Sequence, residues 1–104
     1  MAVDQPQSVG TNALLENTTA SNNVALGAFS LSTNTTGDDN VALGYAALRD
    51  NTTASNNTAV GYFALEANTT GTRNVAVGNN AGLAITTGSY NVAVGTFAGD
   101  AITT

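Results

Sequence analysis

The sequence predicts an all-β protein, a parallel β-solenoid of about six coils with 17 residues in each coil. The first observation is the motif Asn-Val-Ala-Leu-Gly, which begins at Asn23 and returns with small changes at positions 40, 57, 74 and 91. The second is a Thr-Thr pair that recurs at the same spacing, with no residue inserted or lost. A strict short period indicates one structural unit stacked on copies of itself.

The composition favours a tightly wound repeat over a conventional globular core. The 104 residues include 18 Ala, 17 Thr, 14 Asn and 11 Gly, but only three Phe, three Tyr and no Trp. Disorder usually brings more Pro and more charge than the single Pro and 9% charged residues found here. Helical repeats need about 33 residues or more, and Thr, Val, Asn and Gly are poor helix formers.

Residues 1–7 are predicted to form a lead-in segment, because Asp4 and Pro6 discourage strand pairing. Residues 8–104 are then a single β-solenoid repeat domain. Each coil is expected to hold one strand at its Asn-Val-Ala-Leu-Gly motif. A second strand is expected around Ser30-Leu31 and its equivalents Ala47-Leu48 and Ala64-Leu65.

Within the motif, Val24 and Leu26 face one way and Ala25 faces the other, since side chains alternate along a strand. We expect the columns that begin at Val24 and Leu26 to supply the apolar filling, and the alanine column to form a narrow packed face. One such coil encloses little apolar volume, whereas ordering each residue costs about 1.5 kcal/mol. Burial of the alanine-rich face against two further copies would offset this cost, so a homotrimer is predicted.

Two columns are predicted to be structural ladders. Glycine is expected where the backbone needs positive φ or close approach, and stacked asparagines can bond the backbone or one another along the axis. The ladder residues are Asn23, Asn40, Asn57, Asn74 and Asn91, together with Gly27, Gly44, Gly61, Gly78 and Gly95. The fifth and sixth coils differ, because Gly82 and Gly99 replace Leu, and Ile85 and Ile102 replace the Asn before Thr-Thr.

The segments NVALGYAALRDNTTA (40–54) and NTAVGYFALEANTTG (57–71) resemble a known kind of repeat. They are similar to the head repeats of trimeric autotransporter adhesins. They also resemble bacteriophage tail-fibre and bacterial surface-protein repeats of the form N-T-A-x-G-x-x-A-L-x-x-N-T-T-G. The likeness covers residues 8–104, although the adhesin-head coil is typically shorter than 17 residues. It implies a left-handed parallel β-roll, three chains side by side and an extracellular place on a cell surface or virion fibre.

Catalysis, cofactors and metal ions are not expected. A Ser or Thr nucleophile would have no imidazole base, since the chain contains no His, and there is no Cys. Asp38 and Asp39 could bind calcium at a corner, but a solvated turn is favoured because the glycine-aspartate nonapeptide of calcium-binding rolls is absent. The net charge of −5, with two Arg and no Lys, argues against nucleic-acid binding. No apolar run is long enough for membrane insertion.

Two further groups of residues are candidate sites. Asn17, Asn34, Asn51 and Asn68 each precede Thr-Thr and match the glycosylation pattern, although capping of turn amides at a corner is the favoured interpretation. The aromatic residues Tyr45, Tyr62, Phe29, Phe63 and Phe97 could contact a glycan or a partner, by stacking on sugars or by packing between subunits. Both alternatives stay open.

The function predicted is a structural and adhesive fibre segment, a stalk or head on a bacterial surface or phage tail. The partners expected are further copies of the chain, with a cell-surface glycan or matrix receptor as an external candidate. The alternative is a self-assembling extracellular filament subunit that adds head to tail. An ice-binding solenoid is less favoured, because adjacent threonines place one of each pair on the wrong face.

Overall fold

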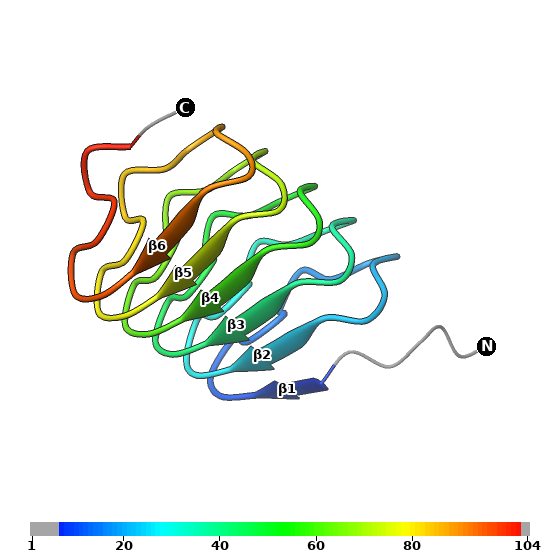
Figure 1. The fold of residues 1–104 in the computed structure, drawn as a ribbon. Helices are drawn as coiled ribbons and strands as arrows, with labels where there is room; N and C mark the ends of the chain where they lie inside the picture. The colour runs from blue at the N-terminus through cyan, green and yellow to red at the C-terminus, as the bar shows by residue number, and fades with distance from the viewer. Residues whose placement is uncertain (1–6, 103–104) are drawn as a thin grey trace.

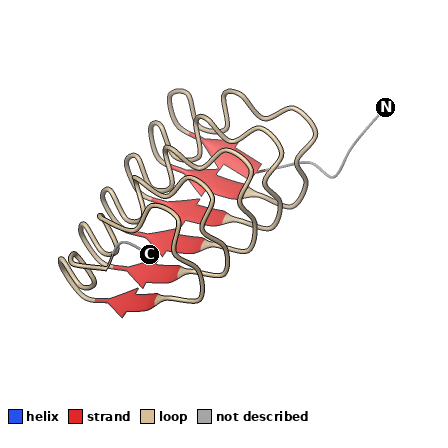
Figure 2. Ribbon diagram, turned by 90° about the horizontal axis from the view of Figure 1, so that it is seen from above, coloured by secondary structure: helices blue, strands red, loops and turns tan. Residues whose placement is uncertain are grey.

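The computed structural model describes residues 7–102, which form one parallel sheet of six short strands wound as a β-solenoid (Figures 1 and 2). The strands are β1 (Gln7–Val9), β2 (Val24–Leu26), β3 (Val41–Leu43), β4 (Thr58–Val60), β5 (Val75–Val77) and β6 (Val92–Val94). Their order in the sheet is their order in the chain, and each residue pairs with its equivalent 17 positions later, as Ala25 does with Ala42. The predicted all-β solenoid is therefore confirmed. The predicted lead-in lies outside the described residues, except for Gln7, which begins β1.

A glycine follows every strand and allows the coils to stack closely at this corner. Gly27, Gly44 and their equivalents from Gly10 to Gly95 have φ between 124° and 136°. A Cβ on Gly27 would lie only 2.7 Å from the carbonyl carbon of Gly44 in the next coil. Glycine is needed here both for its backbone conformation and for the lack of a side chain.

The predicted second strand is wrong, because consecutive tight turns occupy that side of the coil. In the second coil the N–H of Ser30 donates to Gly27 O at 3.2 Å and the N–H of Ser32 donates to Phe29 O at 3.3 Å. Phe29 and Leu31 take φ of 63° and 49°, the left-handed conformation that type II turns place at their third residue. The turns still bind the coils together, since the N–H of Leu31 donates to Ala47 O of the next coil at 3.0 Å.

The interior is lined by the alanine column, so the expected facing of the strands is also wrong. The central alanine of each strand from β2 to β6 is buried, whereas its two neighbours are half-buried or exposed. Leu14, Leu31, Leu48, Leu65 and Ile85 pack against these alanines from the turns on the other side. The molecule measures 42 × 22 × 15 Å, and so thin a coil leaves room for only a methyl group opposite each leucine. The alanine face therefore lies inside each coil and cannot join three copies.

Candidate functional site

The asparagines that open the motifs from Asn23 to Asn74 are buried and link stacked coils. The N–H of Asn40 donates to Asn23 Oδ1 at 2.9 Å, and Asn40 Nδ2 donates to Ala54 O at 2.9 Å. The same two bonds recur at Asn57 and Asn74. Each amide thus satisfies backbone groups that would otherwise be buried without partners. These side chains are structural and offer nothing to a ligand.

The asparagines that precede Thr-Thr form a second internal ladder. Asn51 Nδ2 donates to Asn34 Oδ1 at 2.9 Å and to Ala54 O at 2.9 Å, and Asn68 Nδ2 bonds Asn51 in the same way. Asn34, Asn51 and Asn68 are fully buried, so their amide nitrogens cannot carry a glycan in the folded chain. Asn17 is half-buried at the start of the ladder and donates to Ala20 O at 3.3 Å. These asparagines therefore stabilise the turns at the corners of the coil.

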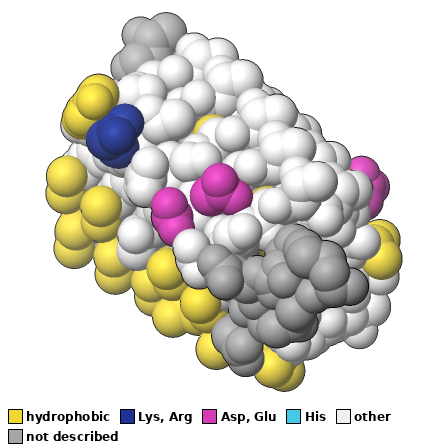
Figure 3. Space-filling model, turned by 90° about the vertical axis from the view of Figure 1, so that its right-hand side faces the viewer, with side chains coloured by type: hydrophobic (Ala, Val, Ile, Leu, Met, Phe, Trp, Pro, Cys, Tyr) yellow, Lys and Arg dark blue, Asp and Glu magenta, His cyan; other side chains and the backbone are white. Residues whose placement is uncertain are grey.

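The outward face of the sheet carries rows of apolar side chains along the solenoid. Figure 3 shows hydrophobic side chains gathered in a band along one side of the molecule. One row is Val24, Val41, Thr58, Val75 and Val92, and the other is Val9, Leu26, Leu43, Val60, Val77 and Val94. All of these side chains are half-buried or exposed, and Val92 is 71% exposed. The two columns that begin at Val24 and Leu26 were expected to fill the core, but they lie on the surface of the coil.

Four of the five candidate aromatic residues come together beside the glycine corner. The rings of Tyr45 and Tyr62 stack with centroids 5.6 Å apart, and Phe29 meets Tyr45 edge-on at 5.8 Å. Phe63 lies edge-on to Tyr62 at 4.3 Å and to Tyr45 at 5.7 Å. Phe97 is exposed and has no ring contact with this group among residues 7–102.

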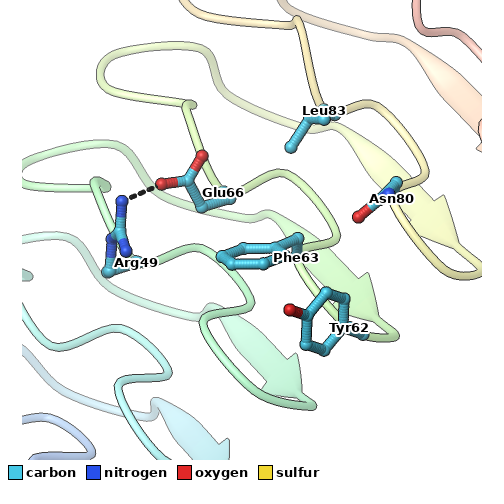
Figure 4. A pocket seen from close by; sticks show the side chains of 6 residues that line it. All are labelled: Arg49, Tyr62, Phe63, Glu66, Asn80 and Leu83. Carbon is cyan, nitrogen blue, oxygen red and sulfur yellow. Dashed lines mark hydrogen bonds and ion pairs between the residues drawn. The ribbon is translucent and has the colours of Figure 1, made fainter.

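A hollow of about 440 Å³ opens next to this cluster (Figure 4). It is lined by Arg49, Tyr62, Phe63, Glu66, Asn80 and Leu83. Arg49 Nη2 donates to Glu66 Oε2, and Arg49 Nε lies 3.4 Å from Asp50 Oδ1. Figure 4 shows Phe63 and Tyr62 between this ion pair and Asn80. The hollow therefore combines two aromatic rings, a paired charge and an amide.

Four residues of the hollow were not predicted as site residues from the sequence: Arg49, Glu66, Asn80 and Leu83. Arg49, Glu66 and Leu83 occupy the same column at intervals of 17 residues, and Asn80 follows Phe63 by 17. A comparison of neighbouring columns could have placed all four beside Tyr62. The repeat period therefore contained the information needed to place these residues beside Tyr62, but their residue types alone did not mark them as site residues.

The remaining candidate groups take part in turns between coils. Asp38 Oδ1 accepts the N–H of Ser21 at 2.7 Å, so this carboxylate holds a corner together. The hydroxyl groups of Thr18 and Thr35 donate to the carbonyl of the equivalent residue in the next coil. Within residues 7–102 no group of three acidic side chains is arranged to hold a metal ion. The same part of the chain contains no helix that could cross a membrane.

No protein-family model matches this chain, and the searches of curated proteins and of solved structures gave no significant match.

Proposed function

We propose that this chain is a structural and adhesive fibre segment, a stalk or head on a bacterial surface or phage tail, which works without catalysis. In this proposal several copies associate through the outward face of the sheet. The observation that carries it is the pair of mostly apolar rows on the outer face, one across five strands and the other across six, whose side chains are half-buried or exposed in the single chain. The sequence resemblance to fibre repeats supports the same function.

Burial of these rows would stabilise an assembly. Removal of apolar surface from water contributes about 25 cal/mol per Å². Parallel sheets are usually covered on both faces, whereas within residues 7–102 the side chains of the outer face stay half-buried or exposed. No charged residue lies in any of the six strands, so like charges do not oppose contact between two such faces.

A second copy is the occupant that fits this face best. The rows repeat at the strand spacing of about 4.8 Å, and another copy offers rows with the same repeat. The side chains of adjacent copies can therefore interdigitate along the whole solenoid, where the outer faces of the copies meet around a common axis. Closed symmetry then limits the number of copies, and three is the number that the resemblance favours.

Light scattering behind a sizing column, at two protein concentrations, tests the proposal. We expect a sharp species near three chains at both concentrations. The variant V41T/L43T/V75T/V77T should have a lower mass and an unchanged circular dichroism spectrum. Thr58 already stands between Val41 and Val75 in the same row, so threonine is compatible with the strand. A monomeric native chain would contradict the proposal.

The alternative is a filament that grows by head-to-tail addition of chains. β1 and β6 are the edge strands of the described sheet, and open strand edges template the addition of further strands. A broad, concentration-dependent mass distribution in the same experiment would support the filament and contradict the closed trimer.

A further inference from the structure

We infer that the hollow beside Tyr62 and Phe63 is a binding site for a neutral pyranose unit of a glycan. The inference rests on the proposed function, because it gives the adhesive segment a class of ligand. It concerns a surface separate from the apolar rows of the sheet, since none of the six lining residues lies in a strand. The two proposals can therefore fail independently.

The aromatic wall suits the apolar face of a sugar ring. The rings of Tyr62 and Phe63 meet at 79° with centroids 4.3 Å apart, so they form a corner with two π faces. Tyr62 is 48% exposed, and the Tyr45 ring stacked on its far side holds it in place. The C–H groups of a pyranose carry partial positive charge and pack favourably on the negative face of such a ring.

The opposite wall offers hydrogen-bonding groups that are held in place. The Glu66 side chain is only 15% exposed, and its ion pair with Arg49 uses one carboxylate oxygen. A carboxylate accepts about four hydrogen bonds and a guanidinium donates five, so both groups keep capacity for ligand hydroxyls. Neighbouring hydroxyls of a sugar both donate and accept hydrogen bonds, so they can donate to the Glu66 carboxylate and accept from the Arg49 guanidinium.

Asn80 supplies an amide that the protein itself does not use. Within residues 7–102 its Oδ1 is buried without a hydrogen-bond partner, and its Nδ2 donates no hydrogen bond. Figure 4 shows the oxygen end of this side chain directed toward Phe63 and Tyr62. An unpaired buried acceptor carries a desolvation cost. A ligand hydroxyl that donates to Oδ1 would remove that cost.

The charges of the hollow select a neutral sugar over an acidic one. Arg49 already contacts two carboxylates, Asp50 and Glu66, so the positive charge is more than balanced at this point. An acidic sugar would meet a net negative site on a chain of net charge −5. The volume of about 440 Å³ lies within the usual range for small-ligand sites of about 300–1,000 Å³.

The test follows backbone amide resonances of the ¹⁵N-labelled protein while methyl glucoside, methyl galactoside, methyl mannoside or N-acetylneuraminic acid is added. We expect at least one neutral glycoside to shift resonances around Tyr62, Phe63, Glu66 and Asn80. The Phe63→Ala and Asn80→Ala variants should each bind that glycoside about tenfold more weakly. Both substitutions are compatible with the coil, because Ala46 occupies the same column with φ of 59°.

Phe29→Ala is the matched control, because Phe29 shares that column and packs on Tyr45 but does not line the hollow. It should leave glycoside binding unchanged. The inference is overturned if no neutral glycoside shifts these resonances, if Phe63→Ala binds as the native chain does, or if N-acetylneuraminic acid binds more tightly. Phe63→Ala should also keep the native molar mass; a loss of assembly would make the ring an intersubunit contact and overturn the inference. A monomeric native chain that still binds the glycoside would contradict only the proposed assembly.

Discussion

The first four coils and the last two fill the same interior in different ways. In the first four, a leucine is followed three residues later by an asparagine, as in Leu65 and Asn68. In the last two, glycine takes the place of leucine and isoleucine takes the place of asparagine, as in Gly82 and Ile85. Large and small residues have exchanged positions within the coil.

The exchange keeps the interior filled. A Cβ on Gly82 would lie 3.3 Å from Ile85 Cδ1 and 3.0 Å from Leu65 Cδ2, so the isoleucine side chain has moved into the space that a leucine occupies in earlier coils. Gly99 has the same relation to Ile102, whose Cδ1 would be 3.4 Å away. The hydrogen-bond ladder ends at the exchange, because the Ile85 side chain cannot donate and Asn68 Oδ1 has no partner among residues 7–102. The volume of the core is thus the stricter requirement, and the ladder can end at the cost of one unpaired acceptor.

The largest effect is expected from Gly61→Ala. This substitution disrupts the close stacking of glycine corners, which is common to the first four coils and the last two. A Cβ at Gly61 would lie 2.4 Å from Gly78 O, so the coils would have to separate. We expect a loss of about 3 kcal/mol or more in the free energy of unfolding, measured in urea. Gly95→Ala is the control, because its φ of 124° is similar but the nearest atom would be 3.7 Å away. Its cost should be smaller, about 1–3 kcal/mol from backbone strain alone; equal costs would contradict the close-approach argument.

A double-mutant cycle at Gly82 and Ile85 sharpens the comparison between the two regions. Gly82→Leu alone should overpack the core against Ile85, and Ile85→Asn alone should leave a void beside the glycine. The double variant restores the pattern of the first four coils and gives Asn68 Oδ1 a donor. We expect it to be more stable than the sum of the single effects by about 2 kcal/mol. Additive effects in thermal unfolding would show that the exchange is not coupled.

A smaller effect should separate two members of the asparagine ladder. Asn51 donates to Asn34 and Ala54 and accepts from Asn68, so Asn51→Ala removes three hydrogen bonds. Asn68→Ala removes two bonds and also eliminates the unpaired Oδ1. Urea unfolding should therefore show that Asn51→Ala costs about 1 kcal/mol more than Asn68→Ala. A larger cost at Asn68 would mean that its oxygen has a partner in solution.

The period and the strand positions could be predicted from the sequence, but the inside and outside of the coil could not. Alternation along a strand tells which residues share a face, and it is symmetrical with respect to the two faces. The informative signal was that the column of Ala25 never contains a larger residue, which is what a confined interior demands. Hydrophobicity pointed the other way, because Val24 and Leu26 are more apolar than alanine.

The turns and the hollow were missed for different reasons. Phe29 and Leu31 adopt positive φ, which is uncommon for large side chains, so their propensities indicate a strand where the chain makes turns. The hollow depends on residues that lie one coil apart, such as Arg49 and Glu66, and no local motif marks it. The winding hand and the trimer implied by the resemblance stay predictions.

Two adjacent residues of β3 test most directly whether alanine faces the interior of the coil and valine faces outward. Ala42 is fully buried, whereas Val41 lies on the outer face. In urea unfolding we expect Ala42→Val to lower stability by about 2 kcal/mol or more, through overpacking. Val41→Thr should lower it by less than about 1 kcal/mol. A tolerated Ala42→Val together with a severely destabilised Val41→Thr would place valine in the core and contradict the fold and the function proposed from its outer face.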